Sequence, residues 1–176
     1  YYKGFRMLTL GWSDGHTFIP TDFAMLSSQT ACLNGINEDI DKRSHGYKRR
    51  LEALKKAPEV IPNMIDRTLQ NGVQASHVLM DTWFTHAPLI RAVLERGLDV
   101  VGMVKDTNQR YQVHGHSLSL KELYKVASIK TFKRTNVLRS ITTTLSGDIP
   151  VKIVFVQHRS KKRAWLAILS TDVSLV

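Results

Sequence analysis

The apolar and polar positions of the first 105 residues predict a series of short elements. Two apolar, strand-like runs flank Asp14-Gly15, a dipeptide typical of tight β-hairpin turns. Pro20 lies in the second run, and we expect it at an edge or a bulge because proline cannot donate a ladder hydrogen bond. Apolar residues then recur at helical spacing, alternating with short apolar runs. The elements expected next are helices at 48–56, 58–70 and 86–96 and strands at 75–80 and 99–105.

The strand–helix–strand unit at 75–105 implies a parallel pair of strands with a right-handed crossover. An antiparallel hairpin ahead of a parallel unit predicts an α/β fold, with a mixed sheet flanked by helices. The last third of the chain is rich in Thr and Val and predicts a β-rich extension of that sheet. The strands expected there are 110–113, 129–132, 137–145, 151–157 and 164–169, with one short helix at 121–127.

Positive charge is concentrated in the second half of the chain. The whole sequence has 25 Lys and Arg against 15 Asp and Glu, a formal net charge of +10. Residues 89–176 hold 15 basic and 6 acidic side chains, whereas the first half is nearly neutral. Repeated cations on one surface are typical of proteins that contact the phosphates of nucleic acids, although a solvated surface tuned for solubility is the alternative. The candidate DNA-binding residues are Lys105, Arg110, Lys130, Lys133, Arg134, Arg139, Arg159, Lys161, Lys162 and Arg163.

A second charged run, at 38–56, mixes both signs and contains few apolar residues. It predicts a solvated connector, with contact to a phosphate backbone as the alternative. The single cysteine, Cys32, excludes an intrachain disulfide and a cysteine-based zinc site, which favours a reducing, cytoplasmic environment. No apolar run approaches the roughly 18 residues that a membrane span requires.

Asp81 is the strongest candidate for chemistry. It follows the apolar strand at 75–80 directly, and ligands of open α/β sheets bind at the carboxyl ends of strands. A carboxylate there can hold a hard cation such as Mg²⁺. Equally, Asp81 could cap the helix that follows. Two-metal phosphoryl transfer needs further acids, and the other carboxylates of the chain do not share this strand-end setting.

The remaining candidates have simple structural explanations. Trp83 and Phe84 follow Asp81 and are interpreted as core or site-wall aromatics, with base stacking as the alternative. The spacing of His114 and His116 around Gly115 predicts a hairpin turn rather than a metal site. The sequence contains no phosphate-binding loop, no dinucleotide fingerprint and no serine-hydrolase motif.

Three stretches together resemble bacterial DDE transposases of the group named after insertion sequence four. Residues 2–20 (YKGFRMLTLGWSDGHTFIP) are similar to the early hairpin of that group. Val78-Leu79-Met80-Asp81-Thr82-Trp83-Phe84 is similar to its second catalytic-aspartate motif. Residues 163–172, ending in Leu169-Ser170-Thr171-Asp172, are similar to the strand before its last catalytic helix. The order of the three stretches covers nearly the whole chain.

The resemblance implies an RNase H-like fold in which three acids bind two Mg²⁺ or Mn²⁺ ions. Only one acid is carried over to this chain, Asp81, as a metal ligand and catalytic residue. The other two are expected before Tyr1 and beyond Val176, so 1–176 is expected to be the middle of a catalytic domain and inactive alone. Its expected parts are a core at 1–105, a basic β-rich insertion at 106–160 and a returning strand at 161–176.

The activity implied is cutting and joining of double-stranded DNA at transposon ends and target sites, by an endonuclease and strand transferase. The resemblance also implies a bacterial, nucleoid-associated protein without a membrane anchor, and it is compatible with a homodimer in the complete protein. Two other functions remain open at this point. One is a non-catalytic nucleic-acid-binding module, and the other is a different RNase H-like nuclease. The chain could also be the remnant of a defective transposase.

Overall fold

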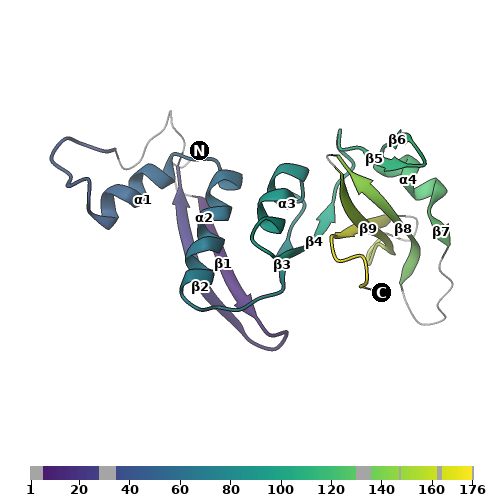
Figure 1. Ribbon diagram of the computed structural model, residues 1–176, viewed down its shortest axis with the longest axis horizontal. Helices are drawn as coiled ribbons and strands as arrows, with labels where there is room; N and C mark the ends of the chain where they lie inside the picture. The colour runs from purple at the N-terminus through teal and green to yellow at the C-terminus, as the bar shows by residue number, and fades with distance from the viewer. Residues whose placement is uncertain (1–5, 28–34, 130–135, 147, 162–163, 176) are drawn as a thin grey trace. The chain divides into compact units, whose positions relative to one another are not determined.

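A computed structural model describes residues 6–27, 35–129, 136–146, 148–161 and 164–175 (Figure 1). Cys32 and the candidate DNA-binding residues Lys130, Lys133, Arg134, Lys162 and Arg163 lie outside these described residues. The chain forms two compact units, which divide between Ala75 and Ser76. Within the described part, no helix combines the length and the apolar character needed to cross a membrane.

The first unit is a β-hairpin with two helices. Its elements are β1 (Arg6–Ser13), β2 (Phe18–Leu26), α1 (His45–Ala53) and α2 (Ala57–Gln70). The turn at Asp14-Gly15 is confirmed, since Asp14 Oδ1 accepts hydrogen bonds from the backbone of His16 and Thr17. The pairing shifts between Leu10 and Gly11, where Gly11 lies opposite Pro20, so the predicted bulge at Pro20 is also confirmed.

One face of the hairpin packs against α2 (Figure 1). The buried residues of this small core are Ala24, Leu26, Val60 and Met64, with Leu8, Leu10 and Ala57 packed against them. Pro58 occupies the first turn of α2, where its missing N–H costs nothing, and Gly72 follows the helix at φ +83°. The helix predicted at 58–70 is therefore confirmed.

The second unit is a mixed eight-stranded sheet with two helices. Seven strands follow the order β3-β4-β10-β9-β8-β5-β6, and β7 pairs with β8 beside this path. The strands are β3 (His77–Met80), β4 (Asp99–Val104), β5 (Tyr111–Val113), β6 (His116–Leu118), β7 (Ser128–Ile129), β8 (Val137–Leu145), β9 (Ile149–Gln157) and β10 (Trp165–Ser170). The helices are α3 (Ala87–Leu94) and α4 (Leu120–Val126).

The α/β class and the mixed sheet flanked by helices are confirmed. The parallel pair β3–β4 is present, and the β-rich region joins the same sheet because β10 pairs with β4. Within the first unit, β1 and β2 form a two-stranded sheet of their own.

The apolar strand predicted at 75–80 is exposed to solvent at Leu79. The side chains of Leu89, Ile90 and Val93 on α3 are buried, as are Val100 and Val104 on the neighbouring strand. Leu79, however, is 79% exposed. Successive side chains of a strand point to opposite faces, and the exposed Leu79 lies between the partly buried Val78 and Met80 of β3.

Candidate functional site

The two parallel strands of the second unit define two edges of the sheet, which we call the carboxyl edge and the amino edge. At the carboxyl edge β3 and β4 end, and at the amino edge they begin. Asp81 follows β3 and therefore lies at the carboxyl edge, as the sequence predicts. Its side chain is exposed, and none of the ion pairs found among the described residues includes it.

A tight turn fixes the orientation of Asp81. Its Oδ1 accepts a hydrogen bond from the backbone N–H of Trp83 at 2.8 Å. Its carbonyl accepts one from the Thr85 hydroxyl at 2.7 Å and one from the Phe84 N–H at 3.2 Å. The cap of α3 is His86, so Asp81 does not cap that helix and this alternative is excluded. One carboxylate oxygen thus organises the turn, which leaves the second available for a cation.

Gly102 provides the space that this turn needs. A Cβ atom at Gly102 would overlap the Thr85 hydroxyl and would lie 3.2 Å from the Met80 carbonyl oxygen. Thr85 is 6% exposed and donates a hydrogen bond to the Asp81 carbonyl, so neither Thr85 nor the Met80 backbone can move away easily. The turn that positions Asp81 therefore requires glycine at position 102.

We expect Gly102→Ala to destabilise the second unit by about 1–3 kcal/mol, the usual cost of overpacking. Urea denaturation measures this. Gly46→Ala is the matched control, because its Cβ would meet only the Ser44 hydroxyl oxygen, at 3.9 Å, inside helix α1. The control should be neutral or slightly stabilising, since alanine favours helix. Equal denaturation midpoints for wild type and Gly102→Ala would show that the turn tolerates a side chain there.

Trp83 is exposed beside Asp81, so of the two predicted positions, core or site wall, the structure excludes the core. The Trp83 side chain is 76% exposed, whereas Phe84 is half-buried. The Lys105 Nζ lies 4.5 Å from the centroid of the Trp83 ring, a cation–π contact. Lys105 follows β4 directly, so Asp81, Trp83 and Lys105 share the carboxyl edge.

The antiparallel ladders bring further cations to the same edge. Trp165, the first residue of β10, pairs with Gln157, the last of β9. Ala167 pairs with Val104, so the connection from β9 to β10 lies at the carboxyl edge. This connection contains Arg159 and Lys161, both exposed. Strands lie about 4.8 Å apart, and β10 and β9 are the second and third strands from β3, which puts this connection about 10–14 Å from β3.

Two other cations predicted to bind DNA have different surroundings. Arg139 lies over the Tyr124 ring, 4.8 Å from its centroid, and donates hydrogen bonds to the carbonyls of Lys125 and Ala127. It therefore secures the end of α4 to β8. Arg110 precedes β5, whose first residue pairs with Leu145 at the far end of β8, so the ladder separates it from the carboxyl edge.

Three side chains that the sequence did not single out gather at the amino edge. His77, Asp99 and Asp172 each offer one ligand atom, and these atoms lie within 4.8 Å of one another. His77 and Asp99 are paired at the start of β3 and β4. The sequence already indicated that His77 and Asp99 begin two parallel strands. The position of Asp172 beside them depends on the pairing of β10 with β4, which the sequence did not indicate. Asp81 lies at the opposite end of β3, so this group does not include it.

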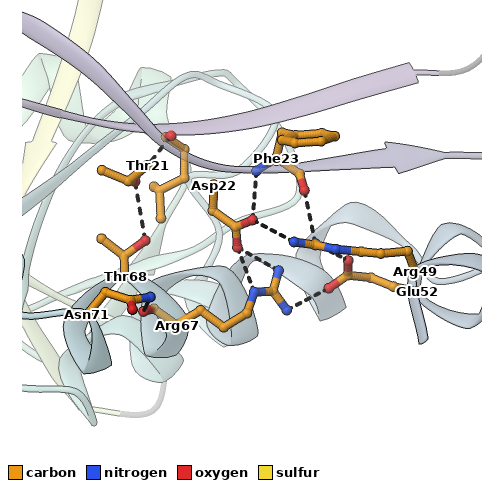
Figure 2. A network of polar contacts seen from close by, with 9 residues as sticks. Thr21, Asp22, Phe23, Arg49, Glu52, Arg67, Thr68 and Asn71 are labelled. Atoms are coloured by element: carbon orange, nitrogen blue, oxygen red, sulfur yellow. Dashed lines mark hydrogen bonds and ion pairs between the residues drawn. The ribbon is translucent and has the colours of Figure 1, made fainter. Parts of the chain in front are cut away.

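In the first unit, Asp22 is enclosed by two arginines (Figure 2). Its carboxylate accepts hydrogen bonds from Arg49 at 3.1 Å and from Arg67 Nε at 2.7 Å. Both arginines also bind Glu52, at 2.7 and 2.9 Å. Because the Asp22 carboxylate is fully engaged with the two arginines, it is unsuited to hold a metal ion.

In a comparison with known protein families, the family described as DDE superfamily endonuclease matches residues 1–120. The matched residues include the hairpin, the helices α1, α2 and α3, the strand pair β3–β4 and Asp81. No curated protein matches the chain.

Proposed function

Because the chain belongs to the DDE superfamily of endonucleases, we propose that it forms the central part of a bacterial DNA transposase's catalytic domain. Within the transposases, we propose that the protein belongs to the insertion-sequence-four-like group. The observation that carries the proposal is the composition of the carboxyl edge. An exposed, oriented carboxylate, Asp81, shares this edge with Lys105 and with the exposed cations of the β9–β10 connection.

Endonucleases of this superfamily use divalent metal ions, and the donor set at Asp81 fits such an ion. Its carboxylate is exposed, has no cationic side chain bound to it among the described residues, and is oriented through one oxygen by Trp83 N–H. Oxygen ligands are those that Mg²⁺ and Mn²⁺ prefer. In the intact enzyme we propose two ions, which would activate water or a 3′-hydroxyl and stabilise the leaving oxygen. Asp81 would act as a metal ligand rather than a general base.

Double-stranded DNA is the proposed substrate, at transposon ends and at the target. Lys105, Arg159 and Lys161 would bind its phosphates, while Trp83 would present a flat face to a base or sugar. The estimated 10–14 Å between β3 and the β9–β10 connection is comparable to the ~12 Å width of a major groove. One duplex is therefore wide enough to contact both Asp81 and this connection.

We expect the double variant Arg159→Ala/Lys161→Ala to bind DNA about tenfold more weakly at moderate salt. Each lost phosphate contact reduces the slope of log K against log salt by about 0.9, so the slope should fall by about 2. Fluorescence anisotropy with a labelled duplex at several salt concentrations measures both quantities.

Lys42→Ala/Arg43→Ala is the matched control. It removes the same two residue types from the exposed run before α1, the alternative phosphate-binding segment. The control should leave affinity and slope unchanged. If the control weakened binding and the first variant did not, DNA would bind to that run and the carboxyl edge would have no such role. The cleavage reaction itself is tested by replacing Asp81, in the intact protein.

A further inference from the structure

The amino edge holds a group of potential metal ligands that the proposed cleavage reaction does not use. His77 begins β3, Asp99 begins β4, and the two residues are neighbours in the parallel ladder. The Thr171 N–H donates to the Val100 carbonyl at 3.0 Å, which continues the pairing past β10 and brings Asp172 to the same place. The sheet itself therefore assembles the three ligand atoms within 4.8 Å of one another.

Each of the three side chains has two polar atoms, and a hydrogen bond to one of them orients the side chain while the other can serve as the ligand atom. The His77 Nδ1 is bonded to the Ser76 hydroxyl at 2.8 Å. The Thr171 hydroxyl donates to Asp99 Oδ1 at 2.6 Å. Asp172 Oδ1 accepts from the Ser174 N–H and hydroxyl at 2.9 and 2.6 Å. Metal-binding histidines and carboxylates characteristically have such outer hydrogen bonds, which fix the direction of the ligand atoms.

The second nitrogen of His77 provides an independent observation. Nε2 is shielded from solvent and has no hydrogen-bond partner. The Asp172 Oδ2 lies 3.6 Å from it, which is too long for a hydrogen bond. If His77 is neutral and donates through Nδ1–H to Ser76, Nε2 directs a lone pair toward the carboxylate oxygens, an arrangement that a divalent cation between them would stabilise.

The charge of the group also favours a cation. Asp99 and Asp172 each bring a carboxylate into the group, and carboxylate oxygens are ligands for divalent cations. One imidazole nitrogen with two carboxylates is a donor set that suits Zn²⁺, whereas Mg²⁺ prefers oxygen ligands alone.

We propose that His77, Asp99 and Asp172 bind a divalent ion of the zinc class, which fastens β3, β4 and the segment after β10 together. This site is separate from Asp81, because the four residues of β3 put the two edges about 13 Å apart. Its role is structural and it does not depend on the proposed function. Ligands about 2.1 Å from a tetrahedral ion lie about 3.4 Å apart, so small side-chain rotations close the group around it.

Calorimetric titration of the purified 176-residue chain with Zn²⁺ tests this proposal, together with thermal unfolding in its presence and absence. We expect one strong Zn²⁺ site and a higher Tm with the ion, because only the folded chain assembles the ligands. His77→Gln and Asp172→Asn should each weaken Zn²⁺ binding tenfold or more and abolish the rise in Tm. Far-UV circular dichroism confirms that each variant is folded.

Matched controls separate the group from other ligands. His116→Gln and Asp148→Asn remove an exposed histidine and an exposed aspartate elsewhere in the second unit, and Asp81→Asn removes the proposed catalytic ligand. All three should retain the strong Zn²⁺ site. The proposal is overturned if the wild-type chain shows no Zn²⁺-dependent rise in Tm, or if His77→Gln and Asp172→Asn bind Zn²⁺ like wild type. If the variants were less stable but Zn²⁺ had no effect on the wild-type chain, His77 and Asp172 would form only an ion pair and no metal site.

Discussion

Replacing Asp81 by Asn in the intact protein is expected to abolish strand cleavage while leaving DNA binding intact. Asparagine is nearly isosteric and keeps an oxygen to accept the Trp83 N–H, so the turn should persist. It lacks the negative charge that holds a divalent ion. Metal ions supply several kcal/mol of transition-state stabilisation, and losing about 4 kcal/mol slows a reaction about a thousandfold. Cleavage of a supercoiled plasmid carrying the element ends, with Mg²⁺ or Mn²⁺, measures the loss.

Asp148→Asn is the control for the removal of an exposed carboxylate from a turn. Asp148 has a φ of +67°, a conformation that asparagine tolerates well, so its fold should be unchanged. This variant should cleave like wild type. Normal cleavage by Asp81→Asn would refute the role of Asp81 as a metal ligand. If Asp81→Asn lost DNA binding as well, the carboxylate would instead act through the position of Trp83 and Lys105.

The sequence predicted the local elements well because their signals are local. The Asp14-Gly15 turn, the Pro58 start and the Gly72 stop of α2 each depend on the backbone preferences of one or two residues. The position of Asp81 was predictable for a similar reason, since a carboxylate directly after a strand must lie at the edge where that strand ends.

Features that depend on which strands pair were not predictable. The exposure of Leu79 and Trp83 follows from the open face of β3 and from the turn after it, and apolar residues in a short run give no sign of this. Arg139 was grouped with the DNA-binding cations by charge, yet its bonds to Lys125 and Ala127 depend on the packing of α4. Likewise, Asp172 joins His77 only through the register of β10.

The charged network around Asp22 was missed because its members are far apart in the sequence. Asp22 is on β2, Arg49 and Glu52 are on α1, and Arg67 is on α2 (Figure 2). The side chains of Asp22 and Glu52 are only 8% and 11% exposed. Of the nine residues of α1, only Glu52 is buried, so this helix has almost no apolar face to hold it. The network, rather than a hydrophobic contact, therefore connects α1 to the rest of the first unit.

Asp22→Ala is accordingly expected to destabilise the first unit by about 2–3 kcal/mol. Removing one partner of a buried ion pair costs ~3–5 kcal/mol, because the opposite charge is left unpaired. The side chains of Arg49 and Arg67 are 45% and 36% exposed, so water can solvate their charges after Asp22 is removed. The expected loss of stability is therefore smaller than for a fully buried pair. Hydrogen exchange read by mass spectrometry should show faster exchange in α1 and α2, while amides of β8 and β9 serve as the internal reference.

The same carboxylate predicts how the stability of the first unit changes with pH. Burial alone would raise the pKa of Asp22, but hydrogen bonds from Arg67 and Arg49 outweigh it and hold that pKa below its ordinary value of 3.8. The unfolded chain therefore binds the proton more readily than the folded one. The stabilisation is complete well above pH 3.8 and is lost as the pH falls through the lower pKa of the folded state. Asp22→Ala should remove this part of the acid dependence.

Asp39→Ala is the matched control for this prediction, since it removes one negative charge from an exposed position before α1. It should leave exchange in α1 and α2 unchanged and preserve the acid dependence of wild type. Unchanged exchange in Asp22→Ala would mean that the two arginines are satisfied by Glu52 and water alone, and that α1 is held mainly by its backbone bond from Ser27 N–H to the Ala53 carbonyl. The two variants carry the same net charge, so any difference between them measures the position of the carboxylate rather than the loss of charge.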